Sequence, residues 1–118
     1  MSLVLLLTLG LATQSQGTGA DVSPRQPTLL SLAYVLGQAH ALRQRCATED
    51  QTWRARMRRL LEVEAPAEAD SEALRARFNA GFSDASSRFP RCDARLNTEA
   101  SRVAGEGRRL ATALSAGP

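Results

Sequence analysis

Three side chains in this 118-residue sequence could carry catalytic or metal chemistry: His40, the only histidine, and the two cysteines, Cys46 and Cys92. A catalytic thiol needs a base beside it, but His40 stands six residues before Cys46, about 240° around a helix, so the two would not share a face. A zinc site needs more ligands than these, and a thioredoxin-type redox site needs a CxxC motif. We therefore predict no catalytic residue, no metal and no cofactor; a thiol-dependent enzyme is the less favoured alternative.

The two cysteines are more simply interpreted as a structural disulfide, which is typical of small exported proteins. Cys46 lies at the end of one predicted helix and Cys92 just before another, so the bond would tie two helix junctions together. Closing this loop is worth about 4 kcal/mol in the chain-entropy description. His40 is interpreted as a core-boundary histidine, which would titrate between about pH 5 and 7 if it were half-buried near an acid such as Glu64.

All fifteen basic residues are arginines, and twelve acids leave a net charge of +3. Guanidinium groups grip carboxylates and phosphates bidentately, although codon usage in a GC-rich genome explains the arginine and alanine content more simply. Arg54, Arg58 and Asn79 form the candidate interaction surface; the structural alternative is an ordinary ion pair or hydrogen bond. Nucleic-acid binding is disfavoured, because Trp53 belongs to an apolar stripe and acids are interspersed among the arginines. Expected i,i+4 ion pairs include Asp50 with Arg54, Arg58 with Glu62, and Asp84 with Arg88.

Residues 1–20 have the pattern of a signal peptide. The apolar run from Leu3 to Ala12 is too short to span a bilayer, which takes about 20 residues, and Thr18 and Ala20 suit the −3 and −1 positions of a cleavage site. The segment lacks the Lys or Arg that normally precedes such a run. We expect a periplasmic or secreted protein; the alternative is a buried or disordered N-terminal segment of a cytosolic protein.

Hydrophobic periodicity predicts helices over residues 29–45, 49–64, 71–88 and 94–115. Residues 21–28 are predicted to be a linker, because Pro24 and Pro27 disfavour helix in the residues before them. In the first helix, one stripe at helical spacing is formed by Leu29, Leu32, Ala33, Leu36 and His40. The expected N-caps are Thr28, Thr48 in a capping box with Gln51, Asp70 and Asp93.

These elements predict a single all-α domain over residues 29–115, a four-helix antiparallel bundle or a pair of helical hairpins closed by one disulfide. Gly37 and Gly81 lie within helices, where glycine costs about 1 kcal/mol relative to alanine, so we expect them at close helix crossings. The regular seam of the last helix, which includes Ala100 and Gly107, could face a helix of the same chain or a dimer partner.

The order of certain residues resembles a family of small exported alphaproteobacterial proteins of unknown function. The residues that carry the resemblance are Tyr34, Leu36-Gly37, His40, Leu42-Arg43, Cys46, Trp53-Arg54, Met57, Leu60-Leu61, Phe78-Asn79-Ala80-Gly81-Phe82, Cys92, Glu106-Gly107 and Leu110. The resemblance covers about residues 30–112. It implies a short helical domain with paired cysteines behind a signal sequence, and it supplies no catalytic residue.

We therefore expect a non-enzymatic exported protein that acts as an interaction or accessory protein of the cell envelope. Its partner would be an unknown envelope protein or an anionic surface rather than nucleic acid, and no small-molecule substrate is indicated. The alternative is a binder of anionic membrane or envelope surfaces through arginine-rich faces, whose binding would weaken with added salt.

Overall fold

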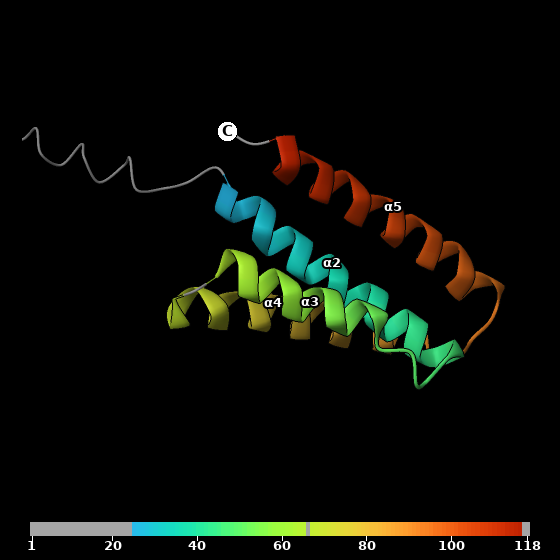
Figure 1. Cartoon of the computed structure of the whole chain (residues 1–118). Coiled ribbons are helices and arrows are strands. Elements are labelled where there is room, and N and C mark those ends of the chain that lie inside the picture. The colour runs from blue at the N-terminus through green and yellow to red at the C-terminus, as the bar shows by residue number, and fades with distance from the viewer. Residues whose placement is uncertain (1–24, 66, 117–118) are drawn as a thin grey trace, which may run out of the picture.

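The computed structural model describes residues 25–65 and 67–116, which form four helices (Figure 1). They are α2 (Arg25–Cys46), α3 (Thr52–Glu64), α4 (Glu68–Arg88) and α5 (Ala94–Ala116). Successive helices run in opposite directions, and no strand occurs in these residues. The predicted all-α four-helix domain is confirmed, whereas the predicted signal peptide lies outside the described residues.

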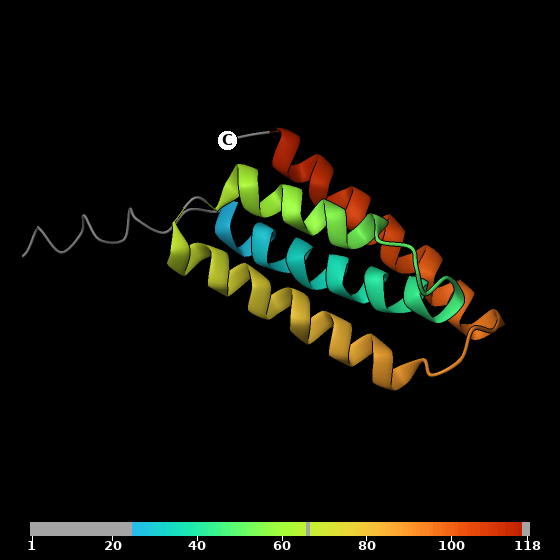
Figure 2. The same cartoon turned by 60° about the horizontal axis from the view of Figure 1, so that its bottom comes forward.

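Helix α2 is the centre of the domain. It lies between α3 and α4, and α5 packs on a further side (Figure 2). Every residue from Val35 to Leu42 is buried, together with Leu29, Leu32 and Ala33. The prediction of a single apolar stripe on this helix was therefore too narrow: α2 has the all-round burial of a helix enclosed by neighbours.

Helices α2 and α4 approach each other closely, and this approach depends on two glycines. A Cβ atom built at Gly37 would lie 2.0 Å from the carbonyl oxygen of Phe78, and one at Gly81 would lie 2.0 Å from the carbonyl oxygen of Tyr34. Only hydrogen atoms fit at these positions, so the two backbones are in direct contact. The prediction of close packing at both glycines is confirmed.

Two helices begin earlier than predicted. Helix α2 starts at Arg25, so residues 25–28 of the predicted linker are helical and Thr28 is not the N-cap. Pro27 is tolerated because it stands in the first turn, where a backbone N–H has no intrahelical acceptor in any case. Helix α4 starts at Glu68, so Asp70 lies in its first turn instead of capping it. A carboxylate in that turn is favoured by the positive end of the helix dipole.

The predicted capping box of Thr48 and Gln51 does not form. Helix α3 begins at Thr52, whose backbone N–H donates to Oδ1 of Asp50 (2.9 Å), while Oδ2 of Asp50 accepts from Nε of Arg43 (2.8 Å). These bonds hold the pKa of Asp50 well below its ordinary value. An aspartate tied to the preceding helix therefore takes the role that the sequence pattern gave to Thr48.

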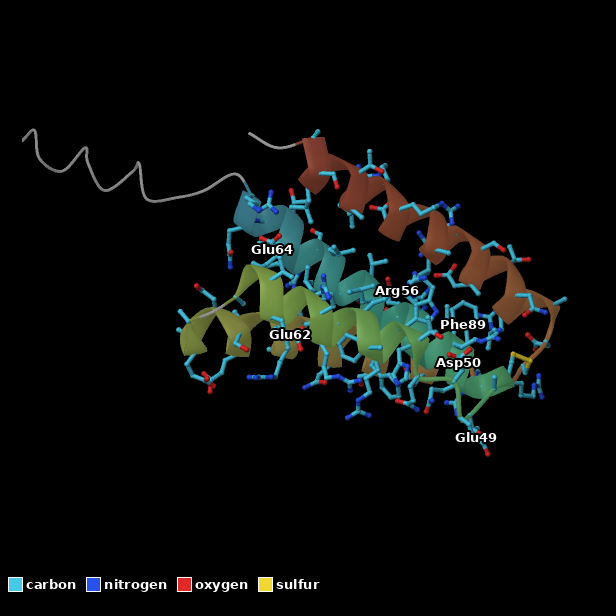
Figure 3. The ribbon with its side chains drawn as sticks, in the orientation of Figure 1. Glu49, Asp50, Arg56, Glu62, Glu64 and Phe89 are labelled. Atoms are coloured by element: carbon cyan, nitrogen blue, oxygen red, sulfur yellow. A yellow bond between two sulfur atoms is a disulfide. The ribbon has the colours of Figure 1, made fainter. Side chains whose placement is uncertain are left out.

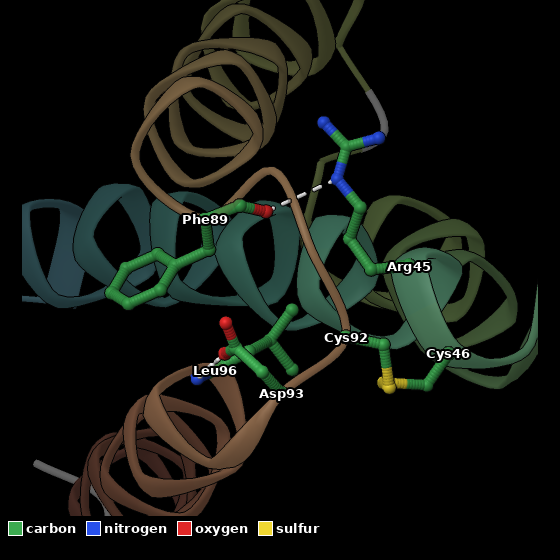
Figure 4. Close-up of a disulfide and its surroundings, with 6 residues drawn as sticks. All are labelled: Arg45, Cys46, Phe89, Cys92, Asp93 and Leu96. Carbon is green, nitrogen blue, oxygen red and sulfur yellow. Dashed lines mark hydrogen bonds between the residues drawn. A yellow bond between two sulfur atoms is a disulfide. The ribbon is translucent and has the colours of Figure 1, made fainter.

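The predicted Cys46–Cys92 disulfide is present, with the two Cα atoms 5.2 Å apart (Figure 4). It joins the end of α2 to the segment that leads into α5. Beside it, Nε of Arg45 donates to the carbonyl oxygen of Phe89 (3.1 Å). The backbone N–H of Leu96 donates to Oδ1 of Asp93 (3.0 Å), which confirms Asp93 as the N-terminal cap of α5.

Candidate functional site

A pocket of about 410 Å³ opens between α3 and α4, with residues of α2 in its floor. We call it the arginine pocket. Its lining residues are His40 and Gln44 from α2, Arg54, Met57, Arg58 and Leu61 from α3, and Arg75, Phe78, Asn79 and Phe82 from α4. The three residues predicted as an interaction surface, Arg54, Arg58 and Asn79, thus come together at one cavity from two different helices.

The charge of the arginine pocket is strongly positive. Its described lining holds three arginines and no acid. The expected partners of two of them do not pair: neither Asp50 with Arg54 nor Arg58 with Glu62 forms an ion pair within residues 25–65 and 67–116. The third arginine, Arg75, pairs with Glu68 (3.8 Å). An anion entering this pocket would therefore meet two guanidinium groups, those of Arg54 and Arg58, that no described acid neutralises.

His40 lies in the floor of the pocket, where only 4% of its surface is exposed. Its ring packs against those of Phe82 (centroids 5.5 Å apart) and Phe78 (5.9 Å), and its Nδ1 atom is buried without a hydrogen-bond partner. Burial lowers the pKa of His40, and the positive charge of Arg54 lowers it further, against a smaller opposing effect of Asp50. Burial and the charge of Arg54 both favour the neutral form of the imidazole.

The acid whose charge acts on His40 is Asp50 and not Glu64. Glu64 ends α3 beside the first turn of α2 (Figure 3), and its carboxylate accepts from Nε (3.1 Å) and Nη2 (2.7 Å) of Arg25. That bidentate pair lowers the pKa of Glu64. The sequence did carry a signal for the position of His40, because His40 and Gln44 are polar residues one turn apart on the same face of the predicted helix.

A second groove of about 550 Å³ separates α3 from α5. Its floor includes Leu32 and Leu36 of α2, and Val63 of α3 is 60% exposed beside it. Trp53, which was expected in the core, is only partly buried at the edge of this groove, where the guanidinium of Arg56 stacks on its ring at 4.5 Å. Arg56 lies on the side of α3 that faces α5 (Figure 3).

The remaining candidate chemistry is limited. Both cysteines are joined in the disulfide, so neither offers a free thiol in this state. In the part of the chain that the structure describes, no three His, Cys, Asp or Glu side chains cluster in a way that could hold a metal ion. None of the described helices combines the length and the apolar character that crossing a membrane requires.

The fold and the pocket together define a small disulfide-closed helical protein with a cationic, partly apolar cavity. Residues 24–117 match the model of a family described as "Protein of unknown function (DUF2385)", and since the match spans most of the chain, the protein belongs to that family. Neither the curated proteins nor the solved structures include a significant match. The predicted membership of a family of unknown function is thereby confirmed at that level.

Proposed function

We propose that the protein is exported and acts, without catalysis, as an interaction or accessory protein of the cell envelope that binds anionic groups through the arginine pocket. The signal-like pattern of residues 1–20 supports export, and so does the resemblance to exported alphaproteobacterial proteins. The Cys46–Cys92 disulfide adds support, because such bonds persist in oxidising compartments and are rare in the cytosol.

The observation that supports anion binding is that two arginines, Arg54 and Arg58, lie next to each other on α3. They stand at i,i+4 on α3, both line the pocket, and no described acid neutralises either of them. Like charges at this spacing destabilise a helix by about 0.2–0.5 kcal/mol. An anion placed between the two guanidinium groups would turn this repulsion into two attractive contacts.

Export is tested by the intact mass of the protein recovered from its native host without reductant. A chain that starts near Asp21 and is lighter by two hydrogens than its reduced form would support export and the disulfide together. A full-length mass with two free thiols would contradict the exported role.

Anion binding is tested with dextran sulfate as the probe, in titrations of the wild type and of two double variants. Arg54→Gln with Arg58→Gln should weaken binding about tenfold, which corresponds to about 1.4 kcal/mol. The matched control, Arg59→Gln with Arg108→Gln, removes the same charge from the rim of the α3–α5 groove and should bind like the wild type. Equal weakening in both double variants would refute recognition by the arginine pocket.

Binding to anionic membranes through arginine-rich faces is the second candidate, favoured by the arginines that rim the exposed apolar α3–α5 groove, Arg56, Arg59 and Arg108. It predicts salt-sensitive flotation with phosphatidylglycerol vesicles and none with phosphatidylcholine vesicles. Here the Arg59→Gln, Arg108→Gln variant should lose vesicle binding. Vesicle binding that does not change with salt would exclude this candidate.

A further inference from the structure

We propose that the arginine pocket binds a small organic carboxylate, with the anionic head between Arg54 and Arg58, a flat apolar body against Phe78 and Phe82, and His40 as the hydrogen-bonding contact in the floor. The proposal rests on the anion recognition proposed above and names its ligand class. It assigns a small-molecule site where the sequence indicated only a surface.

The size and lining of the pocket fit a small molecule better than a flat surface. Its volume of about 410 Å³ lies within the range of about 300–1,000 Å³ that is usual for small-molecule sites. Met57, Leu61, Phe78 and Phe82 provide apolar walls, and the two phenylalanine rings can stack with an aromatic or similarly flat group. A small anion without an apolar body would leave these walls exposed to water.

The head group is a carboxylate because the charged and the apolar groups lie close together. Arg54 and Met57 line the same wall, so an anion that reaches the guanidinium groups also touches apolar surface. Desolvating a doubly charged phosphate beside such surface costs more than desolvating a single negative charge. The planar fork of an arginine matches the two oxygens of a carboxylate.

His40 is an independent indication of a ligand. Buried polar atoms are nearly always hydrogen-bonded, yet no described residue bonds to either ring nitrogen of His40, and its Nδ1 atom is fully buried. Because an unpaired buried acceptor is tolerated better than an unpaired N–H, we assign the proton to Nε2 and leave Nδ1 as an acceptor. Because His40 lines the pocket, this Nε2–H group is a donor for a bound carboxylate or ether oxygen.

The test is a titration by isothermal calorimetry and NMR with three probes: 2-naphthoate, 2-naphthamide and acetate. The first has charge and a flat body, the second has the body without the charge, and the third has the charge without the body. We expect saturable binding of 2-naphthoate and at least tenfold weaker binding of the other two. Equal binding of 2-naphthamide, or no saturable binding of 2-naphthoate, would overturn the proposal.

Three variants, one of them a control, and the ring protons of His40 identify the contacts. Arg54→Gln with Arg58→Gln should weaken 2-naphthoate binding about tenfold, whereas Arg59→Gln with Arg108→Gln should leave it unchanged. His40→Phe should also weaken it about tenfold while the protein stays folded. Because the chain has one histidine, the NMR resonances of its ring protons can be assigned without ambiguity. These resonances should shift as 2-naphthoate saturates the wild type. Unshifted ring protons would remove His40 from the site even if the Phe variant failed to fold.

The proposed function and this proposal fail in different ways. If dextran sulfate binding depends on Arg54 and Arg58 but 2-naphthoate does not bind, the carboxylate site is wrong and anion recognition stands. If neither probe depends on these arginines, both are wrong.

Discussion

Replacing Gly37 or Gly81 with alanine should remove much of the stability of the domain, because the crossing of α2 and α4 has no room for a methyl group. Either Cβ atom would lie 2.0 Å from a carbonyl oxygen of the other helix, whereas ordinary van der Waals contact begins at 3.4 Å. The two backbones would therefore have to separate by about 1.4 Å, the difference between these distances. A gap of about 1 Å already forfeits up to half of the dispersion energy of each contact.

We expect each substitution to lower the free energy of unfolding by about 3 kcal/mol, the upper end of the range for overpacked sites. For a domain of this size that is a fall in Tm of roughly 15 °C. The assay is thermal and urea unfolding followed by far-UV circular dichroism. The matched control is Gly105→Ala in α5, whose Cβ would meet only Nη2 of Arg108 at 3.7 Å. It should raise stability by about 0.5–1 kcal/mol, because alanine is the better helix former.

A Gly37→Ala protein within about 1 kcal/mol of the wild type would refute this reasoning, since it would show that α2 and α4 separate without losing their contacts. A Gly105→Ala protein destabilised as strongly as the other two would refute it as well, because the effect would then come from helix glycines in general.

Further outcomes are expected at three places: the disulfide, His40 and Asp93. Replacing Cys46 and Cys92 with serine should lower the free energy of unfolding by about 4 kcal/mol, measured by urea denaturation against the oxidised wild type, and an unchanged midpoint would contradict the stabilising role of the disulfide. Because burial lowers the pKa of His40 below 6.5, the unfolded chain takes up a proton first as pH falls, so wild-type stability should decrease from pH 7 to pH 5. His40→Phe should remove that dependence and add about 1 kcal/mol at pH 7 by eliminating an unpaired buried atom, and a strongly destabilised variant would argue that His40 is a paired core residue. Asp93→Ala should cost about 1 kcal/mol through loss of the α5 cap, which thermal unfolding would detect, whereas an unchanged Tm would show that this cap is dispensable.

The sequence predicts the number of helices well because their ends coincide with strong signals. Proline follows two of them, and Cys46 and Cys92 stand at helix junctions that the disulfide can join. The first turns are harder to predict because several Ser, Thr and Asp residues compete as caps. Tertiary contacts decide among them: the bond from Arg43 to Asp50 places the start of α3 after Thr48. Local patterns cannot show such a bond.

The central position of α2 is hidden from periodicity for a different reason. Ala39, Ala41 and Gly37 are small enough to suit either an exposed face or a tight interface, so the predicted stripe, which includes Ala33 and His40, leaves them out. The arginine pocket is hidden in a similar way. Its residues come from three helices, and only the packing of both α3 and α4 on α2 brings them together with His40.

The attachment of α5 determines how the molecule can open. Among the described helices, its backbone lies close only to α2, and the disulfide holds its first turn beside the end of that helix. At the other end, Arg25 donates to the carbonyl oxygen of Leu114 (3.1 Å). Helix α5 is therefore fixed covalently next to its first turn, whereas its last turn is held by noncovalent contacts. We expect amide hydrogen exchange to quicken along α5 from Leu96 towards Leu114, and thermal motion to widen the α3–α5 groove at the end that lies away from the disulfide.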